Sequence, residues 1–295
     1  MLYLIDNTIK GGLHLAGKSK IKAHFGNFYK YRYLINELVS KNIKLQYRNS
    51  VLGMFWTFLQ PLLTMIVLSV VFNNIFGRDS KDVVNYPVFL LCGRLLHEFF
   101  TSSTKTAMKS IRSRASIIKK VYVPKYIYPL SAVISKFVTF LISLLVLVVV
   151  ILYFNITDKN PITLTSNLLW AIPPVLVLFF FSLGVGMILA TMNVFFKDIE
   201  NIYDVFCLLL FYVTPIVYTA DRLGYAENSP VGMIIRLNPM YGFIEMFRGA
   251  VIHGAEFYTY FNMNLFYYCC GITVLVLIIG FTMFYRKQDK FILHI

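Results

Sequence analysis

Residues Leu130–Phe154, LSAVISKFVTFLISLLVLVVVILYF, decide the class of fold because they form one apolar run of membrane-spanning length. A helix that crosses the hydrocarbon core needs about 20 mostly apolar residues. Five further blocks satisfy this requirement: Val51–Phe76, Tyr86–Thr106, Leu168–Phe196, Ile202–Thr219 and Leu265–Tyr285. The sequence therefore predicts an all-α membrane protein with six transmembrane helices.

The composition agrees with a membrane environment. Hydrophobic residues make up 58% of the 295 and charged residues only 14%, against about 25% in soluble domains. The net charge of +14 could indicate nucleic-acid binding, but the basic residues lie in the gaps between apolar blocks and form no basic domain. The cysteines lie inside apolar blocks without zinc-site spacing, so we interpret them as small hydrophobic residues: Cys92, Cys207, Cys269 and Cys270.

The distribution of charge predicts the orientation. If the amino terminus is inside, 21 of the 28 lysines and arginines fall in cytoplasmic segments or their flanks, as the positive-inside rule requires. We expect no cleavable signal peptide, because the apolar stretch Met1–Ile5 is too short. Both termini are predicted to be cytoplasmic, with an amino-terminal segment over residues 1–28, an amphipathic helix over 29–48 and a six-span domain over 49–290.

Residues Tyr29–Tyr47, YKYRYLINELVSKNIKLQY, have the helical spacing of an amphipathic helix. Such a helix would lie along the inner membrane interface. Its apolar side, with Tyr31, Leu34 and Leu38, would face the bilayer, and Lys44 and Arg48 would face anionic headgroups or a soluble partner. A plain surface anchor and a partner-binding role are both compatible with this pattern.

A phosphate-binding pattern, GLHLAGKS, occurs at Gly12–Ser19. Such a loop works between a buried strand and a helix of a nucleotide-binding domain. The few residues around this match leave no room for that domain, so we reject a nucleotide site.

The first cytoplasmic loop, RSRASIIKKVYVPKYIYPL over Arg112–Leu130, is basic and contains Pro124 and Pro129, which would break a continuous helix. A short interfacial helix would remain, and its Val121, Tyr122 and Val123 could dock on a soluble subunit. The alternative is a plain basic loop whose charge follows from topology.

Arg94 and Glu98 lie four residues apart in the second predicted span, so they can pair along one side of a helix. Charges at membrane depth usually have a function. A structural pair between subunits and contact with a polar substrate both remain open, and the span could also begin deeper, with both groups at the outer interface.

Aromatic side chains are concentrated in the first and fifth spans, where they suit stacking on sugar faces or the interfacial belts of any membrane protein. These aromatic residues include Phe55, Trp56, Phe72, Phe76, Tyr212 and Tyr218. Between spans five and six, residues 220–264 are too polar and interrupted to cross, so we expect one or two short re-entrant helices at the outer mouth. No HExxH, GxSxG or paired carboxylates are present, which predicts a chain with no catalytic site, metal or cofactor of its own.

Five stretches together resemble the permeases of polysaccharide ABC exporters, the family of O-antigen and wall teichoic acid transporters. They are LQYRNSVLGMFWTFLQPLL (45–63), KKVYVPK (119–125), FFKD (195–198), LLFYVTPIVY (209–218) and LNPMYGFIEMFRG (237–249). The resemblance covers roughly Tyr29–Asp289. Residues 1–28 match no known pattern, and the Arg94/Glu98 pair departs from the family's usual second span.

This resemblance implies a homodimer in the bacterial cytoplasmic membrane that exports an undecaprenyl-linked glycan. Two copies of a separate ATPase would bind ATP and Mg²⁺. Residues Val121–Lys125, with Pro124, would belong to the coupling helix, the 29–48 helix would contact the ATPase, and spans one and five would line the channel. The outer gate helices would carry Asn238, Pro239, Tyr241 and Arg248.

Three other functions stay open. A drug or small-lipid exporter would have a narrower channel without a ladder of rings. A membrane-embedded glycosyl or acyl transferase would need a catalytic pair, for which His97 and Glu98 are the available neighbours. A secondary transporter is disfavoured because the two halves show no repeated pattern of broken spans.

Overall fold

The computed structural model describes residues 31–72, 85–120, 123–157, 162, 166–218, 230–252 and 262–295, and in these ranges the chain forms helices without strands. Val121, Tyr122, Phe76 and the GLHLAGKS segment, all singled out from the sequence, lie outside the described residues. The same holds for residues 1–28.

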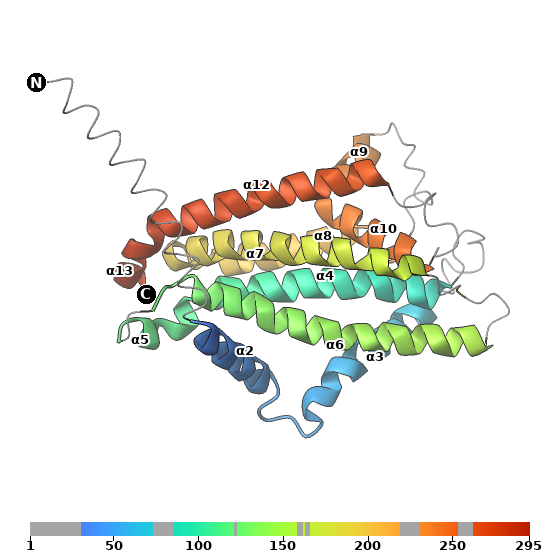
Figure 1. Cartoon of the computed structure of the whole chain (residues 1–295), viewed down its shortest axis with the longest axis horizontal. Coiled ribbons are helices and arrows are strands. Elements are labelled where there is room, and N and C mark those ends of the chain that lie inside the picture. Colours follow the sequence, from blue (N-terminus) through green and yellow to red (C-terminus); the bar gives the residue numbers. More distant parts are fainter. Residues whose placement is uncertain are drawn as a thin grey trace, which may run out of the picture.

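The long helices lie side by side in a bundle (Figure 1). Their bounds are α3 Trp56–Phe72, α4 Tyr86–Lys109, α6 Ile127–Thr157, α7 Ile172–Phe195, α8 Ile199–Val213 and α12 Met263–Lys287. α4 and α7 occupy the middle, α6 and α3 pack on one side, and α12 packs along α7 on the other.

Four stretches are long and apolar enough to cross a membrane: Gly53–Val71, Ile127–Thr157, Ser166–Phe195 and Met263–His294. The protein is therefore a multi-pass membrane protein. The other two expected spans coincide with α4 and α8. α4 carries charged side chains such as Arg94 and Lys105, and α8 has 15 residues, about 22 Å of helix. The charges of α4 and the short length of α8 explain why neither helix is among the four stretches that are long and apolar enough to cross a membrane.

Short helices complete the two ends of the bundle. One end carries α2 Arg32–Gln46, η3 Arg112–Arg114, α5 Ala115–Ile118, η6 Gln288–Lys290 and α13 Phe291–His294. The opposite end carries η4 Ser166–Ala171 and α9 Pro230–Leu237. The 3-10 helix η1 Gly53–Phe55 leads into α3, and α10 Pro239–Ile252 packs among α4, α7, α12 and η4.

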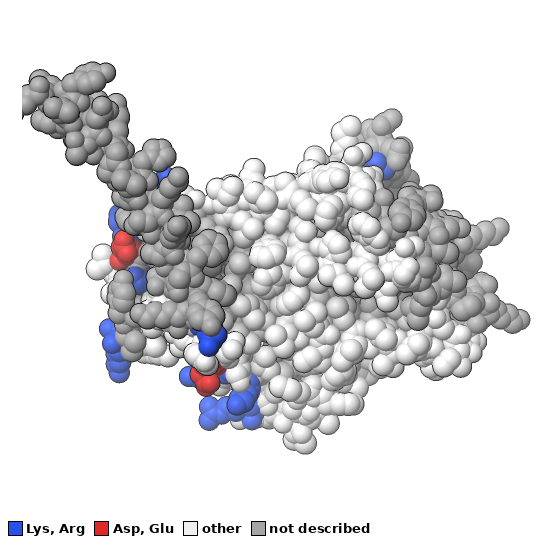
Figure 2. Space-filling view, viewed as in Figure 1, with Lys and Arg blue, Asp and Glu red and all other residues white. Residues whose placement is uncertain are grey.

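Charge separates the two ends. In the view of Figure 2, most lysine, arginine and acidic side chains lie around the end that carries α2, α5 and α13. A basic side chain also lies near α9, and the long flank between is uncharged. We call the end with α2, α5 and α13 the basic end. Membrane proteins concentrate basic residues on the cytoplasmic side, so the asymmetry supports the predicted orientation.

Two glycines bring α7 and α12 into backbone contact. A Cβ atom built on Gly280 would lie 2.5 Å from the carbonyl oxygen of Gly184, and one built on Gly184 would lie 3.0 Å from the backbone nitrogen of Leu277. Small residues at such crossings let membrane helices approach closely and gain van der Waals contact. The α7–α12 pair is therefore closely packed, backbone against backbone.

Two expectations about the basic end need correction. Pro129 does not break a helix, because it lies in the first turn of α6, where the missing N–H has no intrahelical partner to lose. The apolar side of α2 does not simply face the bilayer: Ile35 and Leu38 are buried in a cluster with Ile111 and Ile127, so α2 is packed onto the bundle.

Candidate functional site

The basic end forms one packed unit. Phe291 of α13 is fully buried and contacts the rings of Phe284 and Phe195 at centroid distances of 5.1 and 6.0 Å. Lys125, one of the predicted coupling residues, donates a hydrogen bond to the carbonyl of Gln288 at 2.7 Å. The first cytoplasmic loop is thereby tied to the carboxy-terminal helix.

A second link joins this loop to α2. Arg114 of η3 donates a hydrogen bond to the side-chain oxygen of Asn42 at 2.5 Å, and partial burial lowers the pKa of Arg114 from its usual value. Val123 and Tyr126 pack at the edge of the same apolar cluster. The predicted coupling loop and the predicted interface helix are thus adjacent parts of one surface.

The exposed face of the basic end is strongly cationic. Tyr31 and Leu34 are partly buried, whereas Lys44 and Arg48 are exposed, as the amphipathic pattern predicts. Further exposed cations there are Lys41, Lys119, Lys120, Arg286, Lys287 and Lys290. Such a surface suits anionic headgroups or an acidic patch on a soluble partner.

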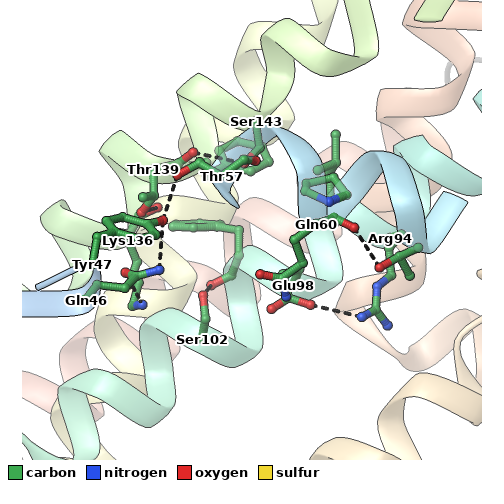
Figure 3. Close-up of a pocket in the computed structure, with 15 residues that line it drawn as sticks. Gln46, Tyr47, Thr57, Gln60, Arg94, Glu98, Ser102, Lys136, Thr139 and Ser143 are labelled. Carbon is green, nitrogen blue, oxygen red and sulfur yellow. Dashed lines mark hydrogen bonds and ion pairs between the residues drawn. The ribbon is translucent and has the colours of Figure 1, made fainter. Parts of the chain in front are cut away.

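The predicted Arg94–Glu98 pair forms, with Nη2 of Arg94 3.2 Å from Oε2 of Glu98. The pair lines a polar cavity of about 100 Å³ between the end of α2 and helices α3, α4 and α6 (Figure 3). Polar lining residues from the four helices are Gln46, Tyr47, Thr57, Gln60, Thr64, Ser102, Lys136, Thr139 and Ser143. The sequence analysis did not assign this cavity, although Lys136 is the one charge in the apolar run Leu130–Phe154.

Several contacts hold the cavity walls in place. The hydroxyls of Tyr47 and Thr57 share a hydrogen bond of 2.6 Å, and Ser143 donates to the carbonyl of Thr57 at 3.3 Å. Lys136 donates to Oε1 of Gln46 at 2.9 Å, and Figure 3 shows both at one end of the cavity, with Arg94 and Glu98 toward the other. The shape of the cavity therefore depends on the position of α2.

His97 does not form a catalytic pair with Glu98. The imidazole is buried and packs edge-on against the ring of Phe211, with centroids 5.4 Å apart, and its Nε2 has no hydrogen-bond partner among the described residues. The carboxylate of Glu98 pairs with Arg94 instead. This geometry disfavours the transferase hypothesis. Within the described ranges, no cluster of histidine, cysteine or acidic residues could hold a metal ion.

Ion pairs connect α4 to α8 near the basic end. Lys105 contacts Asp204 at 2.7 Å, and Lys109 contacts Glu200 at 3.2 Å. Asn193 of α7 also donates to Glu200 at 3.1 Å. Because α8 otherwise packs little against the bundle, these polar contacts fix the position of its first turns.

Arg248, predicted only as part of an outer gate, is the central residue of a buried clamp. Its guanidinium is 3% exposed and donates to the carbonyls of Phe89, Pro215 and Ile216 at 3.2, 2.8 and 2.8 Å. It also lies 3.5 Å from the centroid of the Phe89 ring. Gly93 leaves the necessary space, because a Cβ there would meet Nη2 of Arg248 at 2.6 Å.

The Arg248 clamp supplies hydrogen-bond donors to backbone carbonyls that have no partner within a helix. α8 ends at Val213, and the residues after it are not helical, so their carbonyls lack intrahelical partners in a region without water. Arg248 supplies donors to two of them. The other predicted gate residues support the same corner: the Asn238 side chain caps α10 at Met240 and donates to the hydroxyl of Thr214 at 2.8 Å.

The remaining gate residues start α10. Pro239 is its first residue, and the amide of Tyr241 donates to the carbonyl of Asn238 at 3.0 Å. α9 and α10 are two short helices in the segment where the sequence predicts outer helices; α10 is largely buried, and the role of both as an outer gate stays a prediction.

The predicted channel aromatics face outward in this chain. Phe55, Trp56 and Tyr212 are 56%, 39% and 65% exposed. Tyr218 is partly buried and donates to the carbonyl of Tyr212 at 2.6 Å, and Phe72 ends α3. Exposed rings on α3 and α8 can face lipid, a second copy or a substrate, so the geometry of one chain leaves their role a prediction.

Comparison with known proteins identifies the family. The model of the ABC-2 type transporter family matches residues 33–252. The O-antigen export system permease protein RfbA of Klebsiella pneumoniae is 29% identical over 267 residues, which cover 89% of this chain and 96% of the relative. RfbA of Myxococcus xanthus is 30% identical over 212 residues, 72% and 77% of the two chains. The polysialic acid transport protein KpsM of Escherichia coli is 22% identical over 263 residues, 86% and 93% of the two chains.

The family match spans the helices from α2 to α10, including the polar cavity, the Arg248 clamp and the part of the basic end formed by α2, η3 and α5. It confirms the resemblance inferred from the five sequence motifs. The chain belongs to the ABC-2 type transporter family.

Proposed function

We propose that this chain is the transmembrane subunit of an ATP-driven exporter that moves a lipid-linked cell-surface polysaccharide, of O-antigen or capsule type, across the cytoplasmic membrane. The observation that carries the proposal is the similarity to O-antigen export permeases over 89% of this chain and 96% of the relative. The similarity to a polysialic acid transport protein over 86% of the chain points to the same class of substrate.

The energy for export would come from a separate ATPase subunit that binds ATP and Mg²⁺. The cationic basic end, which joins α2, the first cytoplasmic loop and α13, supplies the docking surface. Val121–Lys125 would enter the ATPase as the coupling segment. Tyr31, Lys44 and Arg48 on and beside the adjacent helix would face the ATPase, while Leu34 and Leu38 would hold that helix on the bundle. ATP-driven closure of the partner would then change the relative stability of two channel states.

The assembly would be a homodimer with two ATPase subunits, and both termini would be cytoplasmic. α4, which runs along the length of the bundle, and α8, which begins near the basic end, would complete six spans. The exposed apolar faces of α3 and α8, with Val67, Val70, Phe206 and Leu209 between 47% and 63% exposed, offer the surface for a second copy. Phe55, Trp56, Phe72, Phe76, Tyr212 and Tyr218 would line the conduit between the copies.

Deletion of the gene tests the proposal. The strain should lose surface polysaccharide and accumulate the lipid-linked glycan on the cytoplasmic side, and a plasmid copy should restore display. Affinity-purified chain should bring down an ATPase with nucleotide-binding motifs. Normal surface polysaccharide in the deletion strain would refute the proposal, as would ATP hydrolysis by the isolated chain.

A further inference from the structure

The polar cavity between α2, α3, α4 and α6 has an imbalance of charge. Arg94, Lys136 and Glu98 line it, so two cations share one carboxylate. Glu98 is within 4.0 Å of Arg94, whereas no carboxylate of the described chain is that close to the ammonium of Lys136. Ionisable groups at membrane depth are costly and usually mark functional sites. An anion in the cavity would balance the extra charge.

The unused hydrogen-bond donors of the cavity belong mainly to these cations. Its hydroxyls are largely committed, since Thr64 donates to Gln60 and Thr139 to Ser135. Lys136 has three N–H donors, of which Gln46 takes one, and Arg94 has five, of which Nη2 contacts Glu98. The donors left over lie toward both ends of the cavity (Figure 3). Strong acceptors with several oxygens, such as phosphate groups, match such donors.

The position of the cavity fits the headgroup region of the inner leaflet. Lys136 is nine residues into α6, which places it about 14 Å from the beginning of that helix at the basic end. Gln46 ends the amphipathic helix α2. The cavity volume of about 100 Å³ has room for a small polar group, since one water needs about 10–15 Å³.

An apolar path leads away from the cavity along α3. Gln60, Thr64, Val67 and Val71 follow one another at helical spacing, so they lie on one side of the helix. The first two line the cavity, and the valines beyond them are 59% and 47% exposed. This side changes from polar to apolar toward the middle of the membrane, as a bound lipid does from headgroup to tail.

We propose that this cavity binds the phosphate or diphosphate headgroup of the lipid that carries the glycan, with Lys136 and Arg94 as its cationic ligands and the lipid tail along Val67 and Val71. The inference rests on the proposed function, which supplies a lipid-linked substrate. Glu98 holds the Arg94 guanidinium in place, and Gln46 orients Lys136, so a shift of α2 would change the site.

The binding test uses tryptophan fluorescence, because Trp56 directly precedes Thr57 in the cavity wall. The full chain, with Trp170 replaced by phenylalanine, is placed in phosphatidylcholine nanodiscs with its copurified partner. Undecaprenyl diphosphate, phosphatidylglycerol and inorganic pyrophosphate are titrated separately. We expect saturable binding of undecaprenyl diphosphate, and Lys136→Gln should weaken it about tenfold or more because a charge-assisted contact is lost. Lys136→Arg should retain most of the affinity.

The matched control is Lys197→Gln, which removes an exposed lysine between α7 and α8, outside the cavity. Its affinity should equal that of the parent, and melting temperatures establish that each variant is folded. Equal binding by Lys136→Gln and the parent overturns the proposal. Equal affinity for phosphatidylglycerol overturns the assignment to the carrier lipid and identifies bulk phospholipid as the source of the phosphate.

The outcomes separate this proposal from the proposed function. If gene deletion abolishes surface polysaccharide but Lys136→Gln binds undecaprenyl diphosphate as tightly as the parent, the export function stands and the proposed headgroup site is refuted. If binding depends on Lys136 but deletion leaves the polysaccharide in place, the cavity is a lipid-phosphate site in a transporter of another substrate.

Discussion

Replacing Arg248 with methionine tests the buried clamp in the outer half of the bundle. Methionine keeps part of the side-chain volume but donates no hydrogen bond, so three carbonyls that now accept from Arg248 lose their partner. Removing one member of a buried charged network typically costs about 3–5 kcal/mol. The fully buried guanidinium also lies on the Phe89 ring at 3.5 Å, so the upper part of that range applies.

The assay is thermal unfolding followed with a fluorogenic maleimide. Cys92, Cys207 and Cys269 are buried and react only when the bundle opens, and Cys92 is adjacent to Gly93 in the clamp. For a domain of this size the Tm falls by about 2–4 °C for each kcal/mol of unfolding free energy that is lost. The expected loss therefore lowers the Tm by on the order of 10 °C. The control is Arg286→Met, which removes an exposed arginine at the basic end and should leave the Tm nearly unchanged. If Arg248→Met melts together with this control, the clamp does not stabilise the fold.

Four further substitutions test the clamp, the α7–α12 crossing and the coupling segment. Gly93→Ala should lower the Tm, because its Cβ would lie 2.6 Å from Nη2 of Arg248 and would expel the guanidinium. The double variant with Arg248→Met should be little less stable than either single variant. Fully additive losses of stability would exclude a shared contact. Gly280→Ala should lower the stability of the fold, because its Cβ would lie 2.5 Å from the α7 backbone. Gly271→Ala is the control: there is open space around Gly271, so alanine should stabilise the same helix by about 0.5–1 kcal/mol. Equal Tm values for the two variants would disprove the close crossing of α7 and α12. Tyr122→Glu should leave ATP hydrolysis by the complex measurable but reduce surface polysaccharide, and undiminished display would remove Tyr122 from the coupling segment.

Periodicity and hydropathy predicted the helical class and the positions of the helices well, because the bilayer imposes both length and apolar composition on a span. Helix α4, which coincides with the predicted second span, begins at Tyr86, the residue at which that span was predicted to begin. The amphipathic pattern of residues 29–48 likewise predicted α2, although not that Ile35 and Leu38 bury their side chains against α6.

Pairings between distant parts of the chain could not be predicted from one sequence. The Arg94–Glu98 contact was predictable because helical geometry places residues four apart on one side. Arg248 reaches carbonyls that are 32 to 159 residues away, and Lys136 meets Gln46 only because α2 folds back on α6. Local periodicity contains no information about contacts between residues that are far apart in the sequence. The Arg248 clamp and the polar cavity could therefore be found only in the three-dimensional structure.

The backbone contact between α7 and α12 has a mechanical consequence. Two helices that touch through glycine, without intervening side chains, have no layer that can slide or repack, so they are expected to move as one rigid body. α3 has few buried residues, and α8 is tied to α4 by ion pairs that can exchange partners. Opening of a conduit should therefore displace these two peripheral helices around an immobile α7–α12 frame. Cross-links between α7 and α12 would then be harmless to transport, whereas cross-links between α4 and α8 would stop it.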